Sequence, residues 1–327
     1  MATARGAHAV ELSSLAELEP ALAGEEFDVA RVYVGYGATA PHRPDPCRLP
    51  AVAYTLEPPR AAQAPFATGD WLTTWSPEDY ASAVDRVRAA IREGDVYQVN
   101  LVQHLRAPFA GDPVALADAL APLRPLEPAV LEGDGWAIVS ASPELLLQKR
   151  GTTIRTSPIK GTRPLGVSIE DAKDAAEHVM IVDLERNDLS RVAEVGSVRW
   201  PELLAERELA GVTHLVATVE AELRDDVTLT ELLEAVLPGG SVTGCPKLAA
   251  LELIAELEPV GRGASMGAFG RIYGNGDLDL ALTIRTFAIA AGEIHLWVGG
   301  GIVWDSVPID EVEESWVKAR PLLAACS

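Results

Sequence analysis

Short polar turns near the C-terminus restrict the fold more than any other feature, because they join strand-like stretches too closely for a helical crossover. Gly274–Gly276 separates the apolar stretches Met266–Tyr273 and Leu278–Ala290, and Ala291–Glu293 separates the latter from Ile294–Val298. Parallel neighbours need a connection of about a dozen residues or more. Turns this short therefore predict antiparallel pairing between successive strands.

Helical patterns fill much of the remaining chain, so the predicted fold class is α+β, with long antiparallel sheets and helices packed outside them. Pro77–Arg92 alternates apolar and charged residues at helical spacing and stops at Gly94. Val96–Leu105 then has strand character, while residues 37–70 are rich in Pro and Ala and are expected to form an irregular connection. Further helices are expected at Asp171–Leu189, Leu229–Val236, Pro246–Glu258 and Asp310–Arg320.

Composition indicates a globular protein that is unsuited to polyanions. The 327 residues are 48% hydrophobic and carry a formal net charge of -21. Nucleic acids and acidic membranes are bound through basic side chains, so we exclude both as main partners. The ordinary role of such a charge is solubility, yet an anionic substrate would need a local cation in order to bind.

Nothing in the sequence predicts export. The first residues are followed by Glu11 and Glu17 rather than by an apolar core and a cleavage site, and there is no apolar run of about 18 residues to span a bilayer. Cys47, Cys245 and Cys326 have unrelated spacings, which fits a reducing compartment. A cytoplasmic location is therefore expected.

Lys160 is a candidate nucleophile, because Pro158–Thr162 surrounds it with an apolar approach and a glycine. A single lysine is ordinarily a solvated surface charge and is seldom buried without a partner. Glu144, at the start of an expected strand, and His214, between a threonine and a leucine, are ordinarily capping or core residues. None of the three identifies a reaction by itself.

Two pairs of acids could bind a hard divalent cation. Asp174 and Glu177 share one face of an expected helix, and Glu311 and Glu314 have the same spacing on the last helix. Mg²⁺ takes one or two such carboxylates, with water and substrate completing its shell. The ordinary explanation of the second pair is a favourable interaction with the helix dipole, together with a capping box that begins at Asp310.

Arg285 and two glycine-rich segments could contact an anion. Arg285 lies within an apolar run and needs a negative partner, for which an internal salt bridge is the ordinary explanation. Lys318 could assist, although its spacing also makes it a helix pair of Glu314. The segment Gly239–Lys247 lacks the adjacent Lys and Ser or Thr of a phosphate loop, so it predicts a turn into a helix. Gly299–Gly301 would let backbone approach a ligand.

Together these segments resemble the chorismate-utilising enzymes, most closely component I of aminodeoxychorismate synthase, from about Trp71 to about Pro321. The resemblance implies two orthogonally packed, largely antiparallel sheets surrounded by helices. Residues 71–327 would form the chorismate-binding catalytic domain, and residues 1–70 a shortened N-terminal segment of the same domain. The motifs that carry the resemblance are Ala141–Glu144, Pro158–Thr162, Lys173–His178, Val182–Asp188, Thr213–Leu215, Pro238–Lys247, Ile284–Thr286 and Gly299–Val303.

The resemblance implies the amination of chorismate with ammonia to 4-amino-4-deoxychorismate, for 4-aminobenzoate and folate or for a specialised pathway. A glutaminase subunit is the expected source of ammonia. Lys160 would attack the ring, Glu144 would protonate the leaving hydroxyl, and His214 would lie beside the ring. The implied Mg²⁺ ligands are Glu177, Glu314, Asp174 and Glu311. The implied substrate-binding residues are Gly161, Thr162, Ser241, Arg285, Gly299, Gly300 and Lys318.

Two positions distinguish the formation of 4-amino-4-deoxychorismate from the alternative activities. By the same resemblance, anthranilate synthase carries a small residue at Lys160, and relatives that use water carry a lysine at Gln98. Ser265 and Arg271 depart from the family pattern and predict an altered pocket wall. The region before Trp71 predicts no tryptophan site. The alternatives are anthranilate synthase component I, another aminating chorismate enzyme, and a non-catalytic chorismate-binding protein.

Overall fold

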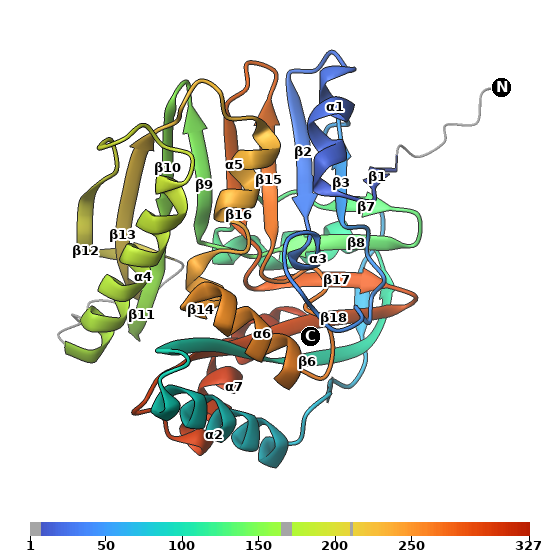
Figure 1. The fold of residues 1–327 in the computed structure, drawn as a ribbon. Helices are drawn as coiled ribbons and strands as arrows, with labels where there is room; N and C mark the ends of the chain where they lie inside the picture. Colours follow the sequence, from blue (N-terminus) through green and yellow to red (C-terminus); the bar gives the residue numbers. More distant parts are fainter. Residues whose placement is uncertain (1–7, 165–171, 210–211) are drawn as a thin grey trace.

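A computed structural model describes residues 8–164, 172–209 and 212–327, with the backbone alone at 162–164, 172–176, 208–209 and 212. Two antiparallel sheets form the body of the molecule. In Figure 1 the strands of the first sheet run upright, those of the second run across the view beneath them, and helices lie outside both. The α+β class and the crossed antiparallel sheets predicted from the sequence are confirmed.

The first sheet has the order β1-β3-β2-β15-β16-β9-β10-β13-β11, and β12 also pairs with β13. Its strands are antiparallel throughout, as the short turns require. Their bounds are β1 Val10–Leu12, β2 Val29–Val34, β3 Val52–Thr55, β9 Leu145–Arg150, β10 Thr153–Ser157, β11 Ile159–Pro164, β12 Arg199–Leu209, β13 Val212–Glu222, β15 Ala268–Tyr273 and β16 Leu278–Leu282.

The second sheet has the order β14-β6-β18-β17-β8-β7, and the short strands β4 and β5 also pair with β6. Its centre is the long pairing of β6 with β18, which extends from Pro108 opposite Glu293 to Val99 opposite Ile302. The bounds are β4 Phe66–Thr68, β5 Leu72–Thr73, β6 Gln98–Gly111, β7 Leu131–Gly133, β8 Trp136–Ser140, β14 Gly244–Cys245, β17 Thr286–Ala290 and β18 Glu293–Ile302.

Helix α2 ends where the sequence predicts. In α2, Ser76 accepts the backbone N–H of Asp79 at the N-cap, and Gly94 closes the C-terminus with a φ of 88°. The α-helices are α1 Leu18–Ala23, α2 Pro77–Glu93, α3 Pro113–Leu120, α4 Ala172–Ser190, α5 Leu229–Val236, α6 Lys247–Leu257 and α7 Pro308–Ala325. The 3₁₀ turns are η1 Leu15–Glu17, η2 Tyr36–Ala38, η3 Ala121–Leu123 and η4 Gly240–Val242.

The largest core lies between the two sheets. Phe269 and Leu280 of the first sheet and Ile138 and Trp297 of the second are buried in it. Smaller cores form where α3 and α7 cover the second sheet and where α2 and α6 pack on β6. Each fully buried large apolar side chain contributes about 1.5–3 kcal/mol of transfer free energy. The crossed sheets are therefore held together mainly by this shared apolar layer.

Three expectations were wrong. The irregular connection 37–70 contains β3, whose Val52–Thr55 pairs with both β1 and β2. The stretch Leu278–Ala290 is not one strand, because it divides into β16 and β17 in different sheets, and Arg285 turns the chain between them with a φ of 49°. Asp310 is not an N-cap, because α7 already begins at Pro308.

The helices within the described ranges do not combine the length and apolarity that crossing a bilayer requires. The division of the chain at residue 70 stays a prediction.

Candidate functional site

Lys160 is held inside the molecule by a bulge in β11. The pairing of β11 with β13 changes register between Lys160 and Arg163, and Gly161 adopts a φ of 60°, which favours glycine. The Lys160 side chain is only 15% exposed, and its Nζ lies 3.4 Å from Glu177 Oε1. The same Nζ donates to the carbonyl of Ser241 at 3.3 Å. Lys160 is therefore not an ordinary surface lysine.

Ser241 joins this lysine to a buried acid. Its Oγ donates to Glu144 Oε1 at 2.6 Å. Glu144 is 5% exposed, and burial raises its pKa to about 7, although the Ser241 hydrogen bond and the Lys160 charge oppose the shift. A carboxyl with this pKa keeps its proton in a substantial fraction of molecules near neutral pH. It is therefore suited to protonate a leaving group.

Arg285 lies where the chain passes from one sheet to the other. Its left-handed backbone is rare for a residue with a Cβ and is found preferentially at functional positions. Burial lowers the pKa of Arg285, and the nearby charge of Glu144 partly offsets that effect. Within the described residues the guanidinium has no salt-bridge or hydrogen-bond partner. Among these residues the internal salt bridge offered as the ordinary explanation is not found, and an external anion could bind there.

His214 lies on β13, beside the bulge. Its Nδ1 is 2.9 Å from the carbonyl of Gly161, and the ring is buried. Burial lowers the pKa of His214, the hydrogen bond to Gly161 opposes this effect, and the charge of Arg285 adds to it, so the neutral ring is favoured. A neutral imidazole in this position can orient a polar group without adding charge.

The glycines of β18 allow side chains from α7 to approach the sheet. Lys318 Nζ donates to the carbonyl of Gly299 at 2.8 Å and pairs with Glu314 at 2.7 Å. A Cβ at Gly300 would lie 3.1 Å from Glu314 Oε1 and 3.5 Å from Glu311 Oε2. The two carboxylates therefore converge on a space that only glycine leaves open.

Glu177 lies beside the next glycine of β18, Gly301. A Cβ at Gly301 would be 2.1 Å from Gln98 Nε2 and 3.0 Å from Glu177 Oε1. Gln98 also donates to Glu177 at 2.8 Å. Lys160, Glu144, Ser241 and Glu177 thus form one connected group, and Glu311, Glu314 and Lys318 form a second group along the same glycine run.

The donor set suits Mg²⁺, because its ligands would be carboxylate oxygens around the space at Gly300. Among the described residues there is no group of three or more His, Cys, Asp and Glu side chains that could hold a metal ion. The side chains of Asp174 and Thr162 lie outside the described residues. The four-acid Mg²⁺ site stays a prediction.

Three charged residues, of which Glu185 and Asp188 are buried, were not predicted as part of the site. Glu185 Oε1 accepts the backbone N–H of Ser241 at 3.3 Å. One turn later on α4, Asp188 pairs with Lys247 at 2.5 Å, and Lys247 also donates to the carbonyl of Pro238. Only the helical spacing of Glu185 with Ile181 and Val182, both buried, could have indicated an inward-facing acid.

The two departures from the family pattern each have a partner within the fold. Ser265 is buried and donates to the carbonyl of Thr283 at 3.1 Å, and Arg271 pairs with Glu127 at 2.7 Å. Their effect on a pocket wall stays a prediction.

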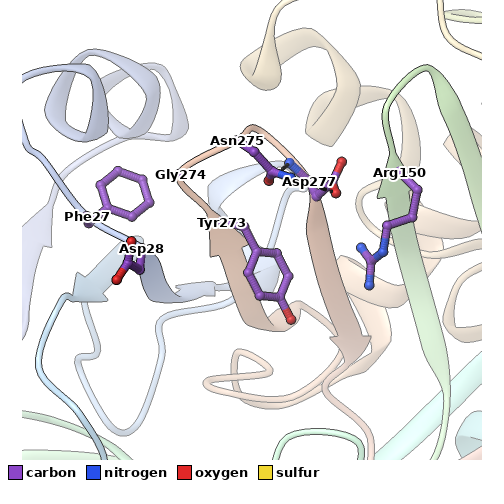
Figure 2. A pocket seen from close by; sticks show the side chains of 7 residues that line it. All are labelled: Phe27, Asp28, Arg150, Tyr273, Gly274, Asn275 and Asp277. Carbon is purple, nitrogen blue, oxygen red and sulfur yellow. Dashed lines mark hydrogen bonds between the residues drawn. The ribbon is translucent and has the colours of Figure 1, made fainter.

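A surface hollow of about 570 Å³ lies elsewhere, around the β15–β16 turn. Figure 2 shows Phe27 and Asp28 on one side of this turn and Arg150 on the neighbouring strand. Arg150 already pairs with Asp279, and Asp277 accepts the backbone N–H of Gly151. None of the predicted site residues lines the hollow, so we do not assign the chemistry to it.

Comparison with known proteins identifies the family of this chain. The family described as chorismate binding enzyme matches residues 31–324. Anthranilate synthase component 1 of Thermus thermophilus is 45% identical over 77% of this chain and 57% of that protein. Aminodeoxychorismate synthase component 1 of Klebsiella aerogenes is 41% identical over 78% of this chain and 59% of that protein. This chain thus spans a little over half the length of these curated relatives.

The fold leads to the same family. The crystal structure of anthranilate synthase component I from Streptococcus pneumoniae matches with a TM-score of 0.79 and 26% identity, over 90% of this chain and 80% of that chain. The match of the family begins at residue 31, about forty residues before the point at which the sequence resemblance was placed. This chain belongs to the family of chorismate-binding enzymes.

Proposed function

We propose that the chain aminates chorismate with ammonia and forms 4-amino-4-deoxychorismate. The observation that carries the proposal is the contact of Ser241 with both Glu144, at 2.6 Å, and Lys160, at 3.3 Å. Contacts with one residue, Ser241, thereby hold a proton donor and an amine close together. This pairing suits a reaction in which one group leaves the ring as another attacks it.

In the proposed reaction Lys160 first loses a proton to solvent, and its neutral amine then attacks C2 of the ring. The ring double bonds shift, the C4–O bond breaks, and Glu144 gives its proton to the departing hydroxyl, which leaves as water. Ammonia then forms a bond to C4, the double bonds shift back, and the Lys160 amine leaves C2. A proton of the new ammonium group returns to Glu144, which restores the acid. The net change replaces a hydroxyl by an amino group, without oxidation or reduction.

Arg285 would bind a carboxylate of the substrate, because a guanidinium fork matches that planar anion. Glu177, Glu311 and Glu314, with Asp174, would hold Mg²⁺. When bound, the ion would supply positive charge for the ring carboxylate of chorismate. Gln98 supports ammonia rather than water as the second nucleophile, since it donates to Glu177 and is no base. A glutaminase subunit would supply the ammonia.

Anthranilate synthesis is the second candidate, because a 45% identical relative bears the name anthranilate synthase component 1. Lys160 favours the first candidate, since the resemblance assigns a small residue to that position in anthranilate synthase. The deciding experiment incubates the protein with chorismate, Mg²⁺ and an ammonium salt. The expected product has the mass of aminodeoxychorismate and is converted by aminodeoxychorismate lyase to 4-aminobenzoate. Anthranilate as the main product would select the second candidate, and isochorismate would contradict both.

A further inference from the structure

Glu185 is a buried acid that the proposed reaction does not use. It lies on α4 with a relative exposure of 2%. Its Oε1 accepts the Ser241 backbone N–H, and its Oε2 has no hydrogen-bond partner among the described residues. A buried polar atom without a hydrogen-bond partner lowers the stability of the fold by about 1–3 kcal/mol. Such a group calls for an explanation beyond packing.

Ser241 connects Glu185 to the reacting groups through three different atoms. Its N–H donates to Glu185, its Oγ donates to Glu144, and its carbonyl accepts from Lys160. The chain before it packs directly on the carboxyl, because a Cβ at Gly240 would lie 3.0 Å from Glu185 Oε1. A displacement of Glu185 would therefore move Ser241 and both of its partners.

The other charges around Glu185 and Glu144 do not remove the electrostatic coupling between these two acids. On the Glu185 side, Asp188 is already paired with Lys247. On the Glu144 side, the facing charges are Lys160 and Arg285. Two buried carboxyls beside one serine do not readily carry charge together, because each carboxylate disfavours ionisation of the other.

We propose that Glu185 is a positioning residue, which holds Ser241 in place and, through its charge, helps Glu144 to keep the proton that it donates. This inference rests on the proposed function of Glu144. Burial raises the pKa of Glu185 to about 8, and the neighbouring charges of Asp188 and Glu144 act in the same direction. Because part of this rise comes from ionised Glu144, Glu185 ionises at a lower pH as long as Glu144 keeps its proton. Since the interaction between two charges is mutual, ionised Glu185 must also disfavour the loss of the Glu144 proton.

The first test is the pH dependence of kcat in Glu185→Gln, which can still accept the Ser241 N–H but carries no charge. The alkaline limb should move to lower pH by about half a unit to one unit, because Glu144 loses the neighbouring charge. The KM for chorismate should change by less than about threefold, since the substrate-binding residues are intact. Asp183→Asn, an exposed acid on the same helix, is the matched control and should leave the limb in place. An unmoved limb in an active Glu185→Gln would overturn the inference.

The second test requires neither turnover nor folding of the Glu185 variant. Carboxyl titrations of protein labelled with ¹³C at glutamate are compared between the natural chain and Glu144→Gln. The Glu185 carboxyl, whose pKa is raised to about 8, should titrate at lower pH in Glu144→Gln, because a like charge has been removed. An unchanged titration would refute the coupling. Failure of the proposed amination would instead appear only in the product assay.

Discussion

At the scale of single residues, Arg285 combines a strained backbone with a cation that lacks an internal partner among the described residues. Its φ of 49° is expensive for a side chain with a Cβ, by about 1–3 kcal/mol. Burial also disfavours its charge. Both costs are understandable if the guanidinium is held ready for an anionic ligand, because a preorganised fork loses little freedom on binding.

The corresponding prediction is that Arg285→Lys weakens chorismate binding by about tenfold to a hundredfold, because a lysine cannot form the bidentate pair. Titration calorimetry with chorismate and Mg²⁺ measures the effect. Arg92→Gln, which alters an exposed arginine on α2, is the control and should bind normally. Equal affinity of Arg285→Lys and the natural protein would remove Arg285 from the substrate site.

At the scale of elements, a buried ion pair ties the glycine-rich turn to the second sheet. Arg262 pairs with Glu258 at 2.7 Å and donates to the carbonyls of Val242 and Asn100, each at 2.8 Å. Glu258 in turn accepts the backbone N–H of Val102. These contacts fix the turn that contains Ser241 to β6.

Arg262→Met should lower the free energy of unfolding by about 3–5 kcal/mol, because it leaves a carboxylate buried without its partner. Denaturant unfolding measures the change. The matched control is Arg86→Met, which breaks an exposed pair with Glu256 and should cost at most about 1 kcal/mol. A similar loss in both variants would show that the buried pair has no special structural role.

The same elements show what the sequence could predict. The hairpin turns and the C-terminal end of α2 at Gly94 depend on residues that are close in the chain, so these features were predicted correctly. The change of sheet at Arg285 was missed, because the apolar pattern continues across it. Glu185 and Asp188 have the appearance of surface acids, since their partners Ser241 and Lys247 lie more than fifty residues away.

At the scale of the whole molecule, the net charge of -21 opposes the binding of a dianion. A bound Mg²⁺ would make the electrostatic potential positive at the substrate site. We predict that a chelator abolishes turnover and that Glu314→Gln weakens Mg²⁺-dependent chorismate binding at least about tenfold. Glu313→Gln, an exposed neighbour that pairs with Arg320, should behave normally in the same binding measurement. Full activity in excess chelator would contradict the metal assignment.

The chain should use ammonium but not glutamine. A glutaminase of the cysteine type needs a thiol with a lowered pKa. Burial raises the pKa of Cys47, of Cys245 and, to about 12, of Cys326. Product formation from glutamine should therefore remain at background level until a glutaminase is added. Glutamine-dependent turnover by the purified chain alone would contradict this prediction.

The central claim is that Lys160 attacks the ring, and product analysis of Lys160→Ala tests it most directly. The variant and the natural protein are given chorismate, Mg²⁺ and ammonium, and chorismate binding is measured separately. The control is Lys149→Ala, which removes a lysine of β9 that donates a hydrogen bond to the Gly276 carbonyl. We predict that Lys160→Ala still binds chorismate but forms aminodeoxychorismate at least about a hundredfold more slowly, with residual product shifted toward anthranilate. Undiminished aminodeoxychorismate formation by Lys160→Ala would show that this lysine is not the nucleophile.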